Sequence, residues 1–165
     1  MNRLFLFTLT FALGLSDAYA ANWSSTNVQI LAGDDFLNPY TNQHYSNTIV
    51  TLEHASNWKY GDNFFFVDII NGDGGPDTQF YGEFQPRISM SKLAGFSYSG
   101  VIKDVLIASQ WNFGKDESAN VSAYLVGLGV DLNIPAAAFF QINAYRRYEQ
   151  ITAGQLQIND ETWQL

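Results

Sequence analysis

Cysteine is absent from this chain of 165 residues, so no disulfide can stabilise it. Histidine is scarce, and His44 and His54 do not form a pair with metal-ligand spacing. Basic residues are few: eight Lys and Arg against sixteen Asp and Glu give a net charge of −8. This charge argues against nucleic acid and anionic lipid headgroups as partners. We therefore expect no metal, no cofactor and no nucleic-acid partner.

Long apolar runs are also missing. None approaches the ~18 residues that a transmembrane helix needs. The longest, from Leu4 to Leu15, follows Arg3 and precedes the small-x-small segment 18–20. This pattern is typical of a cleavable secretory signal peptide over residues 1–20. The remaining residues, 21–165, contain no low-complexity linker and are predicted to form one domain of an exported protein.

What the sequence does contain is a repeated two-residue alternation of apolar and polar side chains. Such alternation indicates β-strands, and no segment keeps a convincing helical period. The sequence therefore predicts an all-β, antiparallel fold. The expected strands are 23–31, 47–56, 63–70, 78–91, 100–113, 119–132, 137–148 and 156–165.

The segments between these strands differ in kind. Residues 33–46, 71–77 and 114–119 are polar and acidic, whereas 58–62 and 134–136 are typical of tight turns. Long loops at one end and short turns at the other are characteristic of an outer-membrane β-barrel. The sequence thus favours a transmembrane barrel, in which the short turns face the periplasm.

The strongest alternation lies in residues 63–70 and 80–87. In a strand, Phe65, Val67 and Ile69 point to one side, and Phe64, Phe66 and Asp68 point to the other. Because a charged side chain facing lipid is costly, we assign the second side to an aqueous lumen. The candidate solute-binding residues on this lumenal side are Glu53, Phe64, Phe66, Asp68, Tyr81, Glu83, Gln85 and Arg87. Their charges are equally compatible with a structural ion network.

The opposite sides of the strands are compatible with lipid. Residues 124–130 and 140–144 place apolar side chains at every second position, and Trp58, Tyr60, Trp111 and Tyr148 suit interfacial aromatic girdles. A soluble periplasmic barrel that binds a small ligand alternates in the same way around a dry core, and it remains the main alternative.

Four segments resemble the nucleoside-specific channel-forming outer-membrane proteins, the Tsx and OmpK-like family. They are TLEHASNWKYGDNFFFVD (51–68), FYGEFQPR (80–87), KDVL (103–106) and GVDLNIP (129–135). The resemblance implies a monomeric twelve-stranded barrel in the outer membrane of a Gram-negative bacterium. It implies passive diffusion of nucleosides and deoxynucleosides. It also implies contact with outer-membrane lipid and lipopolysaccharide, insertion by the barrel-assembly machinery, and in some members use as phage or colicin receptors.

The chain departs from this family in length. Only about eight of twelve strands fit, and the sequence stops at Leu165 instead of a terminal aromatic. Two interpretations follow: an incomplete part of a longer barrel whose final strands are missing, which we favour, or a shortened barrel with eight strands. The interior of an eight-stranded barrel is nearly filled by side chains, so the second form is not expected to transport nucleosides.

Catalysis is not expected. A surface hydrolase needs a nucleophile, a base and an orienting group. His54 is the only histidine within an expected strand, and Ser56 is its nearest hydroxyl in sequence. Lys103 and Asp104 are adjacent and point opposite ways, which predicts a bulge or an interface there.

Overall fold

The computed structural model describes residues 21–38, 42–73, 79–116 and 119–165. The predicted signal peptide, residues 1–20, lies outside these ranges, as does most of the predicted loop 71–77. No helix within them is long and apolar enough to cross a bilayer.

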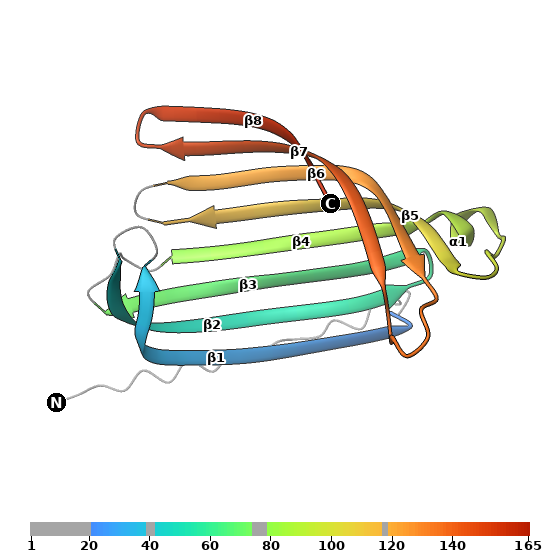
Figure 1. Ribbon diagram of the computed structural model, residues 1–165, viewed down its shortest axis with the longest axis horizontal. Coiled ribbons are helices and arrows are strands. Elements are labelled where there is room, and N and C mark those ends of the chain that lie inside the picture. The colour runs from blue at the N-terminus through green and yellow to red at the C-terminus, as the bar shows by residue number, and fades with distance from the viewer. Residues whose placement is uncertain (1–20, 39–41, 74–78, 117–118) are drawn as a thin grey trace, which may run out of the picture.

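Eight antiparallel strands form one sheet in sequence order (Figure 1). The strands are β1 (Trp23–Asn38), β2 (Gln43–Trp58), β3 (Gly61–Asp73), β4 (Gln79–Ser89), β5 (Ile102–Lys115), β6 (Asn120–Leu132), β7 (Gln141–Ala153) and β8 (Leu156–Gln164). The predicted all-β, antiparallel fold is therefore confirmed. The sheet is open, and β1 and β8 are its two edge strands.

The first predicted loop is wrong over most of its length. Residues 33–46 were expected to leave the sheet, but β1 continues to Asn38 and β2 begins at Gln43. Phe36 pairs with Tyr45 across the two strands, and their ring centroids are 6.0 Å apart. The register shifts between Gly33 and Phe36. This irregularity absorbs the two consecutive aspartates, so the ladder continues beyond a segment whose polarity indicates a loop.

The prediction missed a short helix after β4. Strand 78–91 was expected to run without interruption, but it ends at Ser89 and α1 (Met90–Ala94) follows. The Ser89 side chain accepts a hydrogen bond from the backbone N–H of Lys92, which is an N-cap. Gly95, with a φ of 72°, ends the helix in the left-handed conformation that glycine tolerates best.

The connections also differ from the prediction in length. The tight turn between Trp58 and Gly61 is confirmed, whereas β6 and β7 are separated by residues 133–140 and β7 starts only at Gln141. We call the end of the sheet where β1 begins the proximal end, and the opposite end the distal end. The two longest connections, 90–101 and 133–140, both lie at the proximal end, and the second of them was expected to be a tight turn at 134–136.

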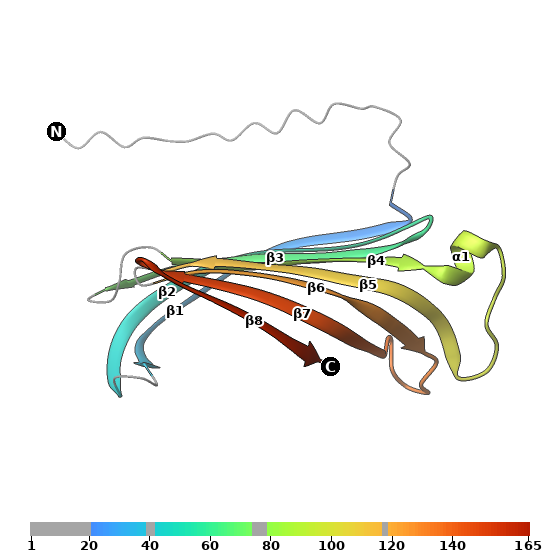
Figure 2. The ribbon, with the colours of Figure 1, turned by 90° about the horizontal axis from the view of Figure 1, so that it is seen from above.

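The sheet is bowed like a trough (Figure 2). The residues of lowest exposure gather on one of its faces, and they include Leu106, Ala108, Ala123, Leu125 and Tyr145, each at most 4 % exposed. Curvature crowds side chains on a concave surface, so this is the concave face. The opposite, outer face carries large exposed apolar side chains on most strands: Val28, Leu52, Ile69, Phe80, Phe84, Ile107, Trp111, Val126, Leu128 and Ile142.

Candidate functional site

The eight predicted site residues share the concave face. Residues that are directly opposite in an antiparallel ladder point to the same side. The register pairs Asp68 with both Thr51 and Tyr81, and it pairs Phe66 with Glu53 and Glu83. By the same rule, Phe64 lies opposite Gln85, and Asp62 lies opposite Arg87. The structure thus groups the predicted residues on one face, and their contact with a solute stays a prediction.

Three rings of this set form a diagonal row from β3 to β4. The ring centroids of Phe64 and Phe66 are 6.2 Å apart, and those of Phe66 and Tyr81 are 6.0 Å apart. All three rings are partly exposed. Their interplanar angles of 48° and 50° mean that the rings do not stack closely on one another. Ring surface therefore remains available to another flat molecule.

Glu83 lies at the centre of a hydrogen-bonded group beside these rings. Its Oε1 accepts from the Tyr81 hydroxyl at 2.6 Å, and its Oε2 accepts from Gln85 and Gln110 at 2.8 and 3.0 Å. Three donors use most of the roughly four acceptor sites of a carboxylate. The contacts hold Glu83 and Gln85 in place, and they leave limited capacity for a solute.

Asp68 and Glu53 are less engaged. Thr51 donates to Asp68 at 2.6 Å, and Asn27 donates to Glu53 at 2.9 Å. Each carboxylate accepts one hydrogen bond among these contacts and is partly exposed. These two acids therefore retain acceptor capacity at the concave surface, close to the ring row.

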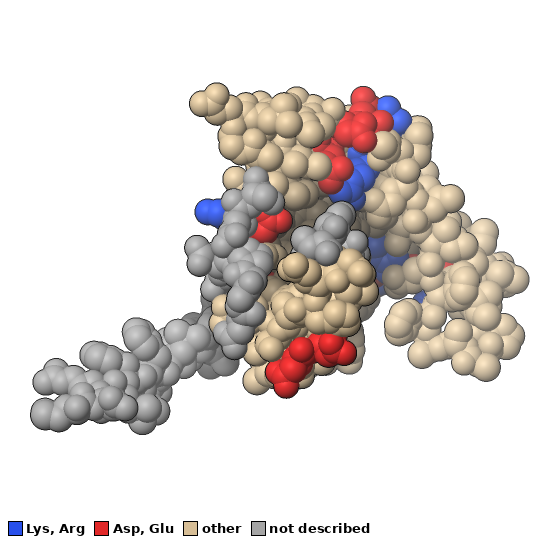
Figure 3. All heavy atoms as spheres, turned by 60° about the vertical axis from the view of Figure 1, so that its left-hand side comes forward, with Lys and Arg blue, Asp and Glu red and all other residues tan. Residues whose placement is uncertain are grey.

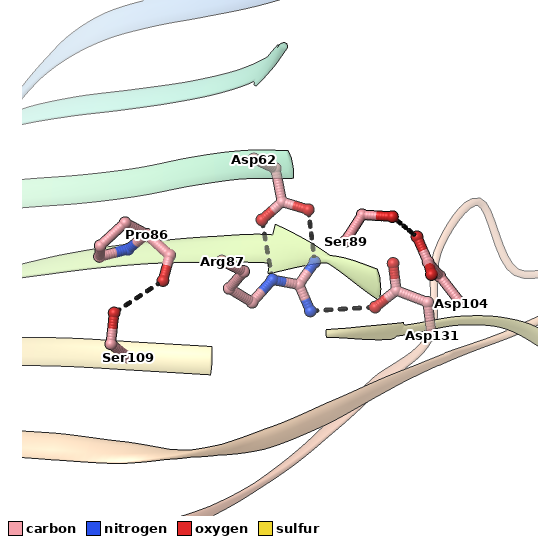
Figure 4. A network of polar contacts seen from close by, with 7 residues as sticks. All are labelled: Asp62, Pro86, Arg87, Ser89, Asp104, Ser109 and Asp131. Carbon is pink, nitrogen blue, oxygen red and sulfur yellow. Dashed lines mark hydrogen bonds and ion pairs between the residues drawn. The ribbon is translucent and has the colours of Figure 1, made fainter. Parts of the chain in front are cut away.

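Arg87 differs from the other predicted site residues because it is buried in an ion network. Its guanidinium binds both carboxylate oxygens of Asp62 at 2.8 Å, and it binds Asp131 at 2.9 Å (Figure 4). Only 5 % of Arg87 is exposed. Asp131 is on β6, so this contact extends diagonally across β5. Of the two readings that the sequence allowed, the structural ion network is the one present for Arg87.

Several polar residues of the concave face were not among the predicted site residues. Asp62 and Asp131 hold Arg87, and Gln110 links Glu83 to Asn112. Further along, Arg147 binds Glu149 at 2.5 Å and Gln164 at 3.1 Å. The two-residue alternation of β5, β6 and β7 places these positions on the polar side, so the alternation was a usable signal. The contacts between these residues could not be predicted from the alternation, because they depend on the register of neighbouring strands.

The predicted irregularity at Lys103 and Asp104 is confirmed. The β5–β6 register shifts between Ile102 and Asp104, so Lys103 is an extra residue. Asp104 is 7 % exposed and accepts a 2.5 Å hydrogen bond from Ser89. Ser89 thus joins the helix cap of α1 to β5. Lys103 itself is exposed.

His54 lies on the outer face. It pairs with Phe65, and the two rings stack at 5.5 Å. The hydroxyl of Thr26, and not that of Ser56, lies 2.7 Å from His54 Nδ1. No group of three or more His, Cys, Asp or Glu side chains in the described ranges has metal-binding geometry.

The antiparallel sheet thus has a polar, ring-bearing concave face and an outer face with large exposed apolar side chains, as strands of an outer-membrane β-barrel do. The family model described as nucleoside-specific channel-forming protein, Tsx, matches residues 19–164. The chain belongs to this family. Searches of curated proteins and of solved structures found no match.

Proposed function

We propose that this protein forms a passage for passive diffusion of nucleosides and deoxynucleosides across the outer membrane of a Gram-negative bacterium. The main support is the division of one sheet into a polar, aromatic concave face and an exposed apolar outer face. The concave face would meet water and solute, and the outer face would meet lipid. The family of the chain supports the nucleoside as the solute.

The position of the apolar side chains supports membrane insertion. We call residues that lie directly opposite one another on successive strands a row. One row of the outer face runs from Ile69 through Phe80 and Lys115 to Asn120, and its side chains change from apolar to polar. Another row runs from Leu128 through Ile107 and Ile88, all apolar. The apolar belt therefore crosses the rows obliquely and moves toward the proximal end from β3 to β6. Strands of membrane barrels are tilted by about 35–45°, which makes a level belt oblique to the rows.

Aromatic side chains line part of this belt. Phe84, Trp111, Tyr124 and Tyr148 occupy successive strands of one row, and Trp111 stacks on Tyr124 at a centroid distance of 6.0 Å. Each is at least 40 % exposed. Exposed rings in a row suit a membrane interface. They argue against the soluble periplasmic alternative, because a soluble protein rarely leaves such a surface uncovered.

The concave face has the groups that a nucleoside needs. A base can stack on the row formed by Phe64, Phe66 and Tyr81, and stacking contributes about 1–3 kcal/mol per base. Asp68 and Glu53 can accept hydrogen bonds from ribose hydroxyls, with Glu83 and Gln85 as further polar contacts. Arg87 would act indirectly, by holding Asp62 and Asp131. Several weak sites in succession allow a solute to enter and to leave.

Uptake into liposomes tests this function. Vesicles that contain the protein should take up labelled nucleosides faster than sugars of similar size. Replacing Phe64 and Phe66 by Ala should reduce this preference several-fold, because stacking surface is lost. Phe65→Ala is the matched control, since Phe65 lies on the outer face. Equal uptake of nucleosides and sugars by the unaltered protein would contradict nucleoside selectivity.

Membrane association tests the rival function. If the protein spans the bilayer, it should stay in the membrane pellet after a carbonate wash. Release into the supernatant would indicate a soluble periplasmic protein.

A further inference from the structure

The two ends of the sheet differ in the sign of their exposed charge. Acidic side chains, including the exposed Asp34, Asp35, Asp160 and Glu161, lie toward the distal end, and Figure 3 shows groups of them there. At the proximal end of the described chain, the acids are Asp62, Asp104 and Asp131, and each is held by Arg87 or Ser89. The exposed charges at that end are the lysines Lys59, Lys92 and Lys103.

Lys103 is separated from its acidic neighbour by the bulge in β5. The extra residue lets Asp104 face Ser89 while Lys103 stays exposed. No hydrogen bond or ion pair within the described ranges engages the Lys103 ammonium group. β-Bulges commonly change the direction of one side chain and are frequent next to functional sites. Here the bulge leaves a cation at the surface next to an acid that is already satisfied.

Lys103 borders a depression of about 320 Å³ at the same end. The other lining residues are Leu132, Asn133, Ile134, Pro135, Ala137 and Ala138. Two hydrogen bonds join this segment to the β4–β5 connection: Asn133 donates to the carbonyls of Val101 at 2.7 Å and Gly100 at 3.0 Å. Hydrogen bonds thus fix the walls of the depression, which are formed by both apolar and polar atoms, and Lys103 lies at its edge.

Further exposed apolar side chains lie at the same end of the sheet. Phe139 is 75 % exposed, Val101 61 % and Leu93 56 %, and all three belong to the two proximal connections. Large apolar side chains together with lysines are what a protein places at the level of lipid headgroups.

We propose that the depression beside Lys103 binds an anionic phospholipid of the leaflet at the proximal end. The ammonium group of Lys103 would contact the lipid phosphate, and the surface of Ile134 and Pro135 would contact the glycerol and the first part of an acyl chain. The site rests on the proposed membrane location. The negative net charge of the whole chain argued against anionic lipid headgroups as partners. The proposed site restricts that argument, because this end of the sheet would attract anions.

Native mass spectrometry can test the site. The full chain is reconstituted in vesicles of phosphatidylglycerol and phosphatidylcholine in equal parts, extracted in a mild detergent, and weighed with the lipids it retains. The unaltered protein should retain phosphatidylglycerol in preference to phosphatidylcholine. Lys103→Gln should lower this ratio about fivefold, the effect expected of one lysine near an anionic surface. Lys103→Arg should keep the ratio.

Lys115→Gln is the matched control, because Lys115 is an exposed lysine of the same strand at the distal end. It should leave the lipid ratio unchanged. An unchanged ratio in Lys103→Gln, or an equal fall in Lys115→Gln, would overturn the site. Nucleoside uptake by the same vesicles separates the two proposals: uptake with an unaltered lipid ratio contradicts only the lipid site. Failure of the unaltered protein to enter vesicles contradicts the membrane function and the lipid site together.

Discussion

At the scale of the residue, the most constrained group is the guanidinium of Arg87. It is almost fully buried between two carboxylates from different strands, Asp62 and Asp131. Removing one member of a buried ion pair leaves the other charge without compensation, which costs more than the pair contributes. The contacts therefore make Arg87 a structural residue of the concave face.

Arg87→Met should lower the free energy of unfolding by roughly 3 kcal/mol, because two acids lose their partner. Urea-induced unfolding, followed by tryptophan fluorescence in lipid vesicles, measures the change. Adding Asp62→Asn and Asp131→Asn to Arg87→Met should restore part of the stability, since the uncompensated charges are gone.

The control is Asp35→Asn. Asp35 contacts His44 at 2.5 Å at the distal end, but the two side chains are 86 % and 57 % exposed, so the loss should stay below about 1 kcal/mol. Equal losses in Arg87→Met and Asp35→Asn would show that the buried network is no stronger than a surface pair.

At the scale of the element, β5, β6 and β7 approach one another closely because small residues lie between them. A Cβ added to Gly127 would lie 1.8 Å from the carbonyl oxygen of Ala144 on β7. The obstacle is backbone, which cannot turn away as a long side chain can. The close approach is next to the buried cluster of Ala108, Leu125 and Tyr145.

Gly127→Ala should therefore destabilise the sheet, by about 1–3 kcal/mol for a forced backbone shift. The midpoint of urea unfolding measures it. Gly72→Ala in β3 is the matched control, because its nearest obstacle would be the Ser46 carbonyl oxygen at 3.3 Å. A midpoint for Gly127→Ala as high as that of Gly72→Ala would contradict the crowding.

At the scale of the whole molecule, the oblique apolar belt predicts which positions of the outer face lie within the bilayer. Ile69 and Asn120 belong to the same row of the outer face. The proposed membrane location nevertheless puts Ile69 in lipid and Asn120 outside the lipid, on the distal side. Because the chain has no cysteine of its own, single cysteines can report the environment of each position.

A charged, membrane-impermeant maleimide should label Phe66→Cys on the concave face and Asn120→Cys beyond the belt. It should not label Val67→Cys or Ile69→Cys in folded protein in vesicles, because hydrocarbon covers them. Labelling after unfolding in urea controls for reactivity. Rapid labelling of Val67→Cys in the folded state would contradict the assignment of faces.

Much of the fold could be predicted from the sequence. The number of strands, their antiparallel arrangement and the faces of β3 and β4 all follow from two-residue alternation, because alternation reflects local backbone geometry. Strand ends were less predictable: the extension of β1 and β2 past Gly33 depends on the pairing of Phe36 with Tyr45. Helix α1 has too few residues to show a helical period.

The sequence by itself determined which side chains share a face, since that is a property of each strand alone. Only the tertiary structure decided which of them meet: Arg87 and Asp131 are 44 residues apart, and a bulge at Lys103 sets the register that brings Asp104 to Ser89. The difference in charge between the two ends has the same origin. The alternation of apolar and polar residues is a local property of each strand's sequence. The contacts between side chains, the curvature of the sheet and the depression beside Lys103 depend on how separate strands align.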